Sequence, residues 1–410
     1  MLESIYASPK SRERFGRCWL RDIIDEYLAH LNSHGYSQGT SRNKGYVLLR
    51  FAEFVEAHGR QTTRDLADWV RPFLASCPPP QYVGVKGTLS LFLRYLRDKG
   101  VLPEEGPFPP DCPFRKTLIE YANYLDEHRN YSDAHTDQIR KHCQCFFRYV
   151  HDSGTGRLRN MTPDLIQRFL VTDAQGYSRK TISKRCEILR ALLSYLHSTG
   201  KTRQDLSSIV VGPRIYRNES CPRFLTRQEV KSVLGAVDQS TGVGKRDYAI
   251  LLLLSTYGLR GIEARRLCLE DIAWREDKIF IRGRKAGNHC AYPLSEHVGQ
   301  AILSYLHSSR PKNGYRQVFL SHLAPHAPLT GSGLMEVLRK HIRLAGLEGK
   351  PFGTHTLRYS CAQYLLEGDF PLKAIGDYLG HRRLGSTRGY LKIDIPHLRE
   401  VARNSGEDLL

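Results

Sequence analysis

The chain has 410 residues, and its 61 Lys and Arg against 42 Asp and Glu give a formal net charge of +19. This length allows two or three domains with buried cores, and the basic excess favours nucleic acid over membrane as a partner. The longest apolar run, residues 249–254, is too short to cross a bilayer, residues 1–16 show no signal peptide, and the ten Cys form no disulfide framework. We therefore expect a cytoplasmic protein with free thiols and no membrane partner, associated with the nucleoid when it is bound to DNA.

The first two hundred residues contain an internal repeat. Residues 51–59, F-A-E-F-V-E-A-H-G, resemble residues 146–154, F-F-R-Y-V-H-D-S-G, and residues 89–100 resemble residues 189–200. Between these blocks, Thr63 and Thr162 each precede an Asp-Leu pair and are typical of helix N-caps. The repeat predicts two all-helical modules, each of about four amphipathic helices. We expect an N-terminal tail at 1–17, a first module at 18–105 and a second at 114–205.

Two linkers are expected beside the second module. Residues 106–113, G-P-F-P-P-D-C-P, hold four prolines and cannot continue a helix, so they predict a stiff, extended segment. A second linker is expected at 206–222, which contains two Pro residues. We expect the first module to bind DNA through a basic face, with a helical spacer or a protein-contact module as the alternative. The candidate residues are Arg42, Lys44, Arg50, Lys86, Arg94 and Arg97.

A third region, residues 223–410, begins with a helix start. Thr226 and Glu229 form a capping box pattern. Residues 245–257 then predict a strongly apolar helix, which Gly258 ends. The turn after this helix contains Arg260 and, three residues on, Glu263.

The middle of this region predicts a β-hairpin. Residues 278–283 and 291–294 alternate between apolar and polar side chains, and the segment between them is polar and contains Gly and Asn. That segment includes two cations, Arg284 and Lys285. A further short strand is expected at 318–321 and a helix from Thr330 onward.

The last motifs gather basic side chains and a phenol. An amphipathic helix ending at Gly368 carries His355 and Arg358 three positions apart, hence on one face. A short helix from about Leu372 to Leu379 is followed by Gly380, His381 and, nine residues later, Tyr390. Fixed guanidinium groups stabilise the charge that develops on a phosphodiester in its transition state, and a tyrosine hydroxyl can act as the nucleophile.

These motifs resemble those of the tyrosine recombinase, or phage-type integrase, family over roughly residues 223–390. The matching features are H-T-L-R, L-G-H, the Tyr nine positions after that second His, and Arg260 with Glu263. The resemblance implies a mainly α fold with a small β-hairpin or sheet, in which two helical SAM-like DNA-binding modules precede a mixed α+β catalytic domain. The second module resembles the family's core-binding domain, and the first looks like another copy of it.

The resemblance also implies a role for each site residue. Tyr390 would form a 3′-phosphotyrosyl link while Arg260, Arg358 and His381 hold the non-bridging oxygens. His355 would assist proton transfer from the tyrosine, and Glu263 would orient neighbouring cations. Lys285, eight residues before Pro293, would protonate the leaving 5′ oxygen, because an ammonium can release a proton and the guanidinium of Arg284 cannot. Arg284, Arg382 and Arg383 are further candidates for DNA contact, and no cofactor or metal is implied.

We therefore expect a site-specific DNA recombinase that integrates, excises or transposes a mobile element. Its expected partners are double-stranded DNA, three further copies in a homotetramer on paired sites, and accessory or sister recombinases. Residues 394–410 would dock on a neighbouring protomer. Two departures from the family pattern are Tyr359, where histidine is frequent, and Gly389 beside the nucleophile. The alternatives are relaxation of DNA by a type IB topoisomerase, a DNA-binding regulator without chemistry, and a metal nuclease, which is weaker because no ligand spacing supports it.

Overall fold

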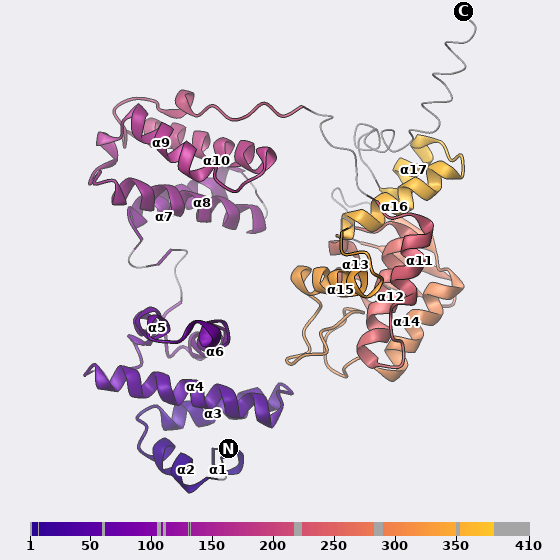
Figure 1. The fold of residues 1–410 in the computed structure, drawn as a ribbon, viewed down its shortest axis with the longest axis horizontal. Coiled ribbons are helices and arrows are strands. Elements are labelled where there is room, and N and C mark those ends of the chain that lie inside the picture. The colour runs from indigo at the N-terminus through magenta and orange to yellow at the C-terminus, as the bar shows by residue number, and fades with distance from the viewer. Residues whose placement is uncertain are drawn as a thin grey trace, which may run out of the picture. The chain divides into compact units, whose positions relative to one another are not determined.

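The structure is a computed structural model that describes residues 2–6, 8–59, 62–104, 108–109, 112–129, 131, 133–216, 224–282, 290–349 and 353–380. It is mainly helical with one small antiparallel sheet, so the predicted fold class is confirmed (Figure 1). None of the described helices combines the length and the apolar character that a membrane crossing requires.

The first helical module extends closer to the N-terminus than the sequence indicates. Its helices are α1 Leu2–Ile5, α2 Pro9–Gly16, α3 Arg21–Ser33, α4 Gln38–Ala57, α5 Leu66–Ala75 and α6 Pro79–Asp98. Residues 1–17 were expected to be a tail, but Tyr6 and Phe15 are buried and the Tyr6 hydroxyl donates a hydrogen bond of 2.7 Å to the Arg42 carbonyl oxygen. The first two helices are therefore attached to α4 by side chains that a tail would leave in water.

One of the two predicted threonine caps is wrong. The Thr162 side chain accepts a hydrogen bond from the Leu165 amide and caps α9 as expected. In the first module the N-cap of α5 is Asp65, two residues after Thr63, and its side chain makes no cap hydrogen bond. The repeated Thr-x-Asp-Leu pattern therefore marks a helix start in both modules without fixing which residue forms the cap.

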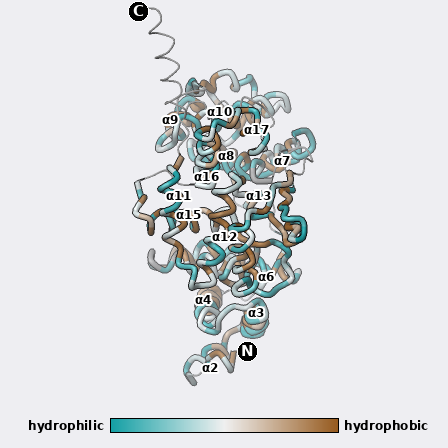
Figure 2. The backbone as a smooth tube through the Cα atoms, turned by 90° about the vertical axis from the view of Figure 1, so that its right-hand side faces the viewer, coloured by the Kyte–Doolittle hydropathy of each residue, from teal (hydrophilic) through white to brown (hydrophobic). Residues whose placement is uncertain are grey.

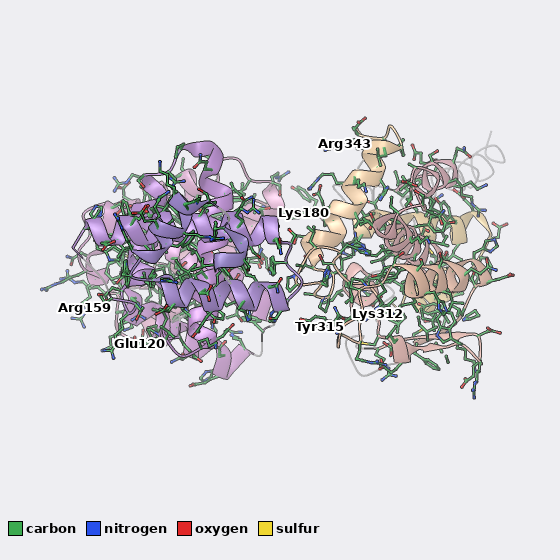
Figure 3. The ribbon with its side chains drawn as sticks, turned by 90° about the horizontal axis from the view of Figure 1, so that it is seen from below. Glu120, Arg159, Lys180, Lys312, Tyr315 and Arg343 are labelled. Atoms are coloured by element: carbon green, nitrogen blue, oxygen red, sulfur yellow. The ribbon has the colours of Figure 1, made fainter. Side chains whose placement is uncertain are left out.

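The second module is a bundle of α7 Arg115–Arg129, α8 Asp133–Asp152, α9 Pro163–Asp173 and α10 Arg179–Ser198 (Figure 1). Its core contains the fully buried Phe146, Phe147, Leu192 and Leu193. Residues from both expected linkers join this core: Phe108 and Cys112 from the first, and Leu206 and Val210 from the second. Each linker therefore begins or ends as part of the bundle. Exposed Lys180, in the first turn of α10, is labelled in Figure 3.

The third region is built around α12. Its elements are α11 Arg227–Gly235, α12 Gly242–Tyr257, α13 Gly261–Arg266, β1 Ile272–Ala273, β2 Lys278–Ile281, β3 Cys290–Pro293, α14 Glu296–Ser308, α15 Gly331–Leu344, α16 Thr354–Glu367 and α17 Leu372–Leu379. Helix α12 contacts α11, α13, α14 and α16. In Figure 2 the backbone near the α12 label is coloured largely as hydrophobic. The helix can make these contacts because its second half is apolar on several sides, with Ala249, Ile250, Leu251, Leu253 and Leu254 all buried.

The predicted hairpin is confirmed, and the sheet and the segment after it differ from the prediction in two respects. Strands β2 and β3 pair antiparallel, with Lys278 opposite Pro293 and Ile281 opposite Cys290, and β1 adds a third strand that the sequence did not reveal. Residues 318–321 were expected to form a strand and do not. The Val318 amide donates to the Leu267 carbonyl, whereas the Phe319 carbonyl accepts from Leu329, so no single strand runs alongside this segment.

Candidate active site

Arg260 is held at the turn between α12 and α13. Gly258 ends α12 with a φ of 58°, a left-handed conformation that glycine adopts without strain. Arg260 is the N-cap of α13, and the buried Glu263 carboxylate accepts hydrogen bonds from its backbone amide at 2.9 Å and from its Nη1 at 2.7 Å. The Arg260 side chain keeps 34% of its surface exposed, against 6% for Glu263. The carboxylate therefore fixes a cation that still reaches solvent.

Arg358 occupies a different environment in the first turns of α16. Its side chain is buried, with 2% of the residue surface exposed. Nη1 donates to the Gly258 carbonyl oxygen at 2.7 Å, and Nη2 donates to the Leu379 carbonyl oxygen. These oxygens belong to the C-terminal ends of α12 and α17, where helix carbonyls lack partners and carry partial negative charge. The guanidinium therefore joins the two helix ends, and its positive charge offsets the partial negative charge of both.

The start of α13 meets the same junction. Arg260 Nη2 lies 3.4 Å from the Gly380 carbonyl oxygen, one residue beyond the end of α17. Gly380 has a φ of 67°, so α17 ends as the sequence predicted, at Leu379. Residues far apart in the chain, 260, 358 and 380, therefore converge on the point where α12 and α17 end.

His355 completes the described part of the site. Burial, followed by the positive charges of Arg358 and Arg260, holds the pKa of His355 below its ordinary value of 6.5. At neutral pH the imidazole is therefore uncharged and can accept a proton. Its ring centroid lies 6.4 Å from that of Tyr359, the residue that stands where the family frequently has histidine.

The remaining predicted site residues lie outside the described residues. These are Arg284, Lys285, His381, Arg382, Arg383 and Tyr390. The same holds for Gly389 and for the segment 394–410. The strands that flank residues 283–289 are described, however, and show how the base of the hairpin is attached to the site.

Three tyrosines that the sequence analysis did not single out attach the hairpin to α12 and α17. The Tyr257 hydroxyl of α12 donates to the Pro293 carbonyl at 2.9 Å, and the Tyr292 hydroxyl of β3 donates to the Tyr378 carbonyl of α17. The rings of Tyr257 and Tyr378 lie 5.3 and 5.1 Å from that of Tyr292. Burial raises the pKa of Tyr257 and of Tyr378, so both phenols are protonated at neutral pH. No local motif marks these residues, because each fits the apolar pattern of its own element.

The candidate DNA contacts of the first module lie on two helices. Arg42 and Lys44 belong to α4, and Lys86 and Arg94 belong to α6. Arg42, Lys86 and Arg94 are exposed, whereas Lys44 is partly buried. In the part of the chain that the structure describes, no group of three or more His, Cys, Asp or Glu side chains is arranged to hold a metal ion.

Comparison with known proteins matches two stretches of the chain to family models. Residues 223–396 match the model described as the phage integrase family, and residues 118–200 match the phage integrase N-terminal SAM-like domain. The first stretch contains every predicted site residue from Arg260 to Tyr390. The second lies within the second helical module.

Similar proteins cover between about three fifths and nearly all of the chain. A Sinorhizobium fredii protein named as an integrase/recombinase, y4rF, is 36% identical over 98% of this chain and 95% of its own length. Tyrosine recombinase XerD of Listeria innocua is 30% identical over 58% of this chain and 82% of its own. Among solved structures, XerH site-specific recombinase in a post-cleavage complex with a palindromic difH substrate aligns with a TM-score of 0.54 and 20% identity, over 76% of this chain and 92% of that one.

Proposed function

The chain belongs to the phage integrase family of tyrosine recombinases, enzymes that cut and rejoin DNA at specific sites, and we propose that Tyr390 is the nucleophile of its strand exchange. The observation that carries the proposal is the junction at which Arg260 and Arg358 bond the ends of α12 and α17, close enough to His355 for both charges to lower its pKa. The last described residue there is Gly380, which His381 follows directly in sequence. Two fixed cations and a neutral imidazole are the groups that a phosphoryl transfer to a phenol requires.

The proposed reaction exchanges one phosphate ester for another. The Tyr390 hydroxyl oxygen attacks the scissile phosphorus, and His355 takes up the phenolic proton. The bond from phosphorus to the 5′ oxygen breaks as Lys285 donates a proton to that oxygen. The 5′ hydroxyl of a partner strand then attacks the phosphorus of the 3′-phosphotyrosyl ester and gives its proton to Lys285. The bond from phosphorus to the phenolic oxygen breaks as His355 returns a proton to that oxygen, which regenerates the phenol and leaves a rejoined DNA strand.

The cations supply the electrostatic part of this reaction. Arg260, Arg358 and His381 hold the non-bridging oxygens as charge develops on them, and the loss of one such donor costs on the order of 3 kcal/mol in barrier height. Glu263 keeps the Arg260 guanidinium in one orientation, so little reorganisation remains to be done during the reaction. Arg358 combines its charge with a second task, because its bonds to two carbonyls hold the junction together.

The substrate and assembly follow from this chemistry and from charge. A net charge of +19 suits duplex DNA, and exchange between two duplexes requires four active sites, hence a homotetramer on paired sites. We assign the two helical modules and the catalytic domain to separate DNA-contacting bodies joined by linkers near 106–113 and 206–222. The reaction serves the integration, excision or transposition of a mobile element, with accessory or sister recombinases as further partners. Relatives named as recombinases favour strand exchange over DNA relaxation.

The test is a covalent trapping experiment. A pool of nicked suicide duplexes with randomised sequence is incubated with the wild-type chain, with Tyr390→Phe and with Tyr315→Phe, whose exposed phenol serves as the matched control. A protein–DNA adduct that resists denaturation is expected with wild type and Tyr315→Phe and is expected to be absent with Tyr390→Phe. An adduct of undiminished yield in Tyr390→Phe contradicts the proposal.

A further inference from the structure

Three phenols of the catalytic domain form a closed circuit of hydrogen bonds, here called the tyrosine triangle. The Tyr257 hydroxyl of α12 donates to the Pro293 carbonyl oxygen of β3 at 2.9 Å, and the Tyr292 hydroxyl of β3 donates to the Tyr378 carbonyl oxygen of α17. The Tyr378 hydroxyl in turn donates to the Thr256 carbonyl oxygen of α12 at 3.1 Å. Each of the three elements therefore gives one hydroxyl to its neighbour and receives one from the other.

The elements that the tyrosine triangle joins are those that lead to the proposed catalytic side chains. Helix α12 ends three residues before Arg260. Strand β3 follows the segment that contains Lys285, and α17 is followed in sequence by Gly380, His381 and then Tyr390. The triangle therefore connects three separate parts of the chain, each of which supplies a different group to the proposed reaction.

Strand β3 depends on Tyr292 for its attachment to α17. The strand lies at the edge of the sheet and pairs with β2. Its buried residue is Tyr292, which is 3% exposed, whereas Ala291 and Pro293 face solvent. The Tyr292 hydroxyl reaches the last turn of α17, where backbone carbonyls have no partner within the helix. This one hydroxyl therefore fastens the edge of the hairpin to the end of α17.

The base of the hairpin restricts where Lys285 can lie. Ile281 and Cys290 pair across this base, and Lys285 is four residues after the first of them. A chain spans at most about 3.5 Å per residue, so the Cα of Lys285 can lie no more than about 14 Å from that of Ile281. A displacement of the hairpin base would therefore be passed on to the lysine.

We propose that Tyr292 is a positioning residue for protonation of the leaving group, because it fixes the hairpin that carries Lys285 to the helix that leads to Tyr390. The ammonium and the phenol act on opposite sides of one phosphorus atom in the same step, so the segments that carry them need a fixed separation. The inference rests on the proposed function, since it takes Lys285 as the proton donor. Packing alone does not need the hydroxyl, because a phenylalanine ring would fill the same space.

The atom that leaves phosphorus provides a selective test of this role. In the proposed cleavage the Tyr390 oxygen bonds to phosphorus, His355 takes the phenolic proton, and the departing 5′ oxygen receives a proton from Lys285. When sulfur replaces that bridging oxygen, the group that departs is a thiolate, which needs no proton because a thiol is far more acidic than an alcohol. Sulfur therefore repairs a defect in proton donation, but it does not repair a defect in folding or in the arginine contacts.

The experiment compares the two leaving groups in the full chain. A duplex recovered from the covalent adducts of the randomised pool is synthesised with oxygen or with sulfur at the 5′ bridging position, and the single-turnover rate of adduct formation is measured. Tyr292→Phe is expected to cut the oxygen-linked duplex on the order of 10- to 100-fold more slowly than wild type, and the sulfur-linked duplex at nearly the wild-type rate. Lys285→Met should show the same pattern with a larger loss. Tyr257→Phe, which detaches the same hairpin from α12, should repeat the pattern and serves as the second variant if Tyr292→Phe does not fold.

The matched control is Tyr305→Phe, at a buried tyrosine of α14 that lies outside the triangle. The Tyr305 hydroxyl accepts a hydrogen bond of 3.3 Å from the Leu320 amide, so this substitution also removes one buried hydrogen bond to the backbone. It should shift the urea midpoint about as much as Tyr292→Phe does, and it should keep the wild-type rate on both duplexes.

Two results overturn the inference: a Tyr292→Phe chain with the wild-type rate on the oxygen-linked duplex, and one that is equally slow on both duplexes. Either result leaves the proposed function intact as long as sulfur rescues Lys285→Met. A Lys285→Met chain that sulfur does not rescue contradicts the proposed role of the lysine instead. An undiminished adduct in Tyr390→Phe contradicts the proposed function as a whole.

Discussion

At the residue scale, the two arginines of the site show how environment separates identical groups. Arg260 is partly exposed and oriented by Glu263, whereas Arg358 is buried between two helix carbonyls. The sequence predicts both residues from their spacing relative to Glu263 and His355. It cannot predict which guanidinium reaches solvent, because that depends on where the ends of α12 and α17 meet.

The protonation state of His355 gives a prediction for the pH dependence of cleavage. Because its pKa lies below 6.5, the neutral base persists as pH falls from neutral to 6.5 and is lost only at lower pH. The single-turnover rate of adduct formation should therefore stay constant over that interval and decline below it. His355→Gln should be slower and lack this acid limb. A wild-type rate that already halves above pH 6.5 contradicts the assignment of His355 as the base.

At the element scale, the end of α12 determines how closely α17 approaches. A Cβ at Gly258 would lie 2.6 Å from Leu379 Cδ2, and the backbone there has a positive φ. Gly258→Ala should lower the free energy of unfolding by about 3 kcal/mol, the sum of a left-handed alanine and overpacking. Cleavage should fall as well, since Arg358 bonds the Gly258 carbonyl.

Gly346→Ala is the matched control for that substitution. Gly346 has a φ of 71°, but a Cβ there would meet nothing within 4 Å. The Gly346→Ala substitution should lower the free energy of unfolding, measured by urea denaturation, by about 1 kcal/mol and leave DNA cleavage unchanged. Equal losses of stability and activity in the two variants would show that the close approach of α17 to α12 is not the cause of the losses in Gly258→Ala.

A buried ion cluster ties α12 to α15. The Asp247 carboxylate accepts hydrogen bonds from Arg246 Nε at 3.0 Å and from His341 Nε2 at 3.0 Å, and Arg246 Nη1 donates to the Leu320 carbonyl at 3.1 Å. Burial acts to raise the pKa of Asp247, but the hydrogen bond from His341 and the charge of Arg246 outweigh it, so that pKa is lowered. The ionised form is therefore the one that stabilises the fold.

Removal of that charge should destabilise the catalytic domain in a pH-dependent way. Asp247→Asn should cost about 3 kcal/mol at neutral pH, because it leaves Arg246 buried without its carboxylate. A carboxyl with a lowered folded-state pKa stabilises above the unfolded value of 3.8 and less as pH falls through the folded value. Urea midpoints should therefore differ equally at pH 7 and pH 5 and converge below 3.8. Glu276→Gln, at an exposed position, is the control. A difference in urea midpoint between wild type and Asp247→Asn that grows as the pH falls would contradict the lowered pKa of Asp247.

The elements that the sequence predicted are those whose signals are local. The capping box of Thr226 and Glu229, and the stops at Gly258, Gly368 and Gly380, depend on a few adjacent residues, and all are found. The Asp247–His341 contact joins residues 94 positions apart, and the backbone bonds of residues 318–321 go to two separate segments. Such pairings depend on how helices pack, so no pattern within one element reveals them.

At the scale of the whole molecule, the internal repeat predicted the helical modules but not where each core ends. Phe108 and Cys112 lie in the expected linker, yet are 2% and 7% exposed in the core of the second module. A chain that starts at residue 106 should keep this core intact. One that starts at residue 114 should lose about 3 kcal/mol, comparable to the truncation of a buried Phe.

Hydrogen exchange of the α7–α10 amides checks this boundary. The amides should exchange at wild-type rates in the chain starting at 106 and faster in the chain starting at 114. Equal protection in both chains contradicts a structural role for Phe108 and Cys112. Both shortened chains retain residues 223–410, so adduct formation in each reports on the catalytic domain separately.

The central claim is that Tyr390 is the nucleophile. This claim requires the phenol, which lies ten residues after Gly380 in sequence, to react beside the junction of α12, α16 and α17. Digestion of the trapped protein–DNA adduct, followed by mass spectrometry of the nucleotide-bearing peptide, measures it directly. The modified peptide should contain Tyr390, with the 3′ phosphate on its phenolic oxygen. A phosphate carried by any other residue, or a cleaved strand with no protein attached, would contradict the proposed mechanism.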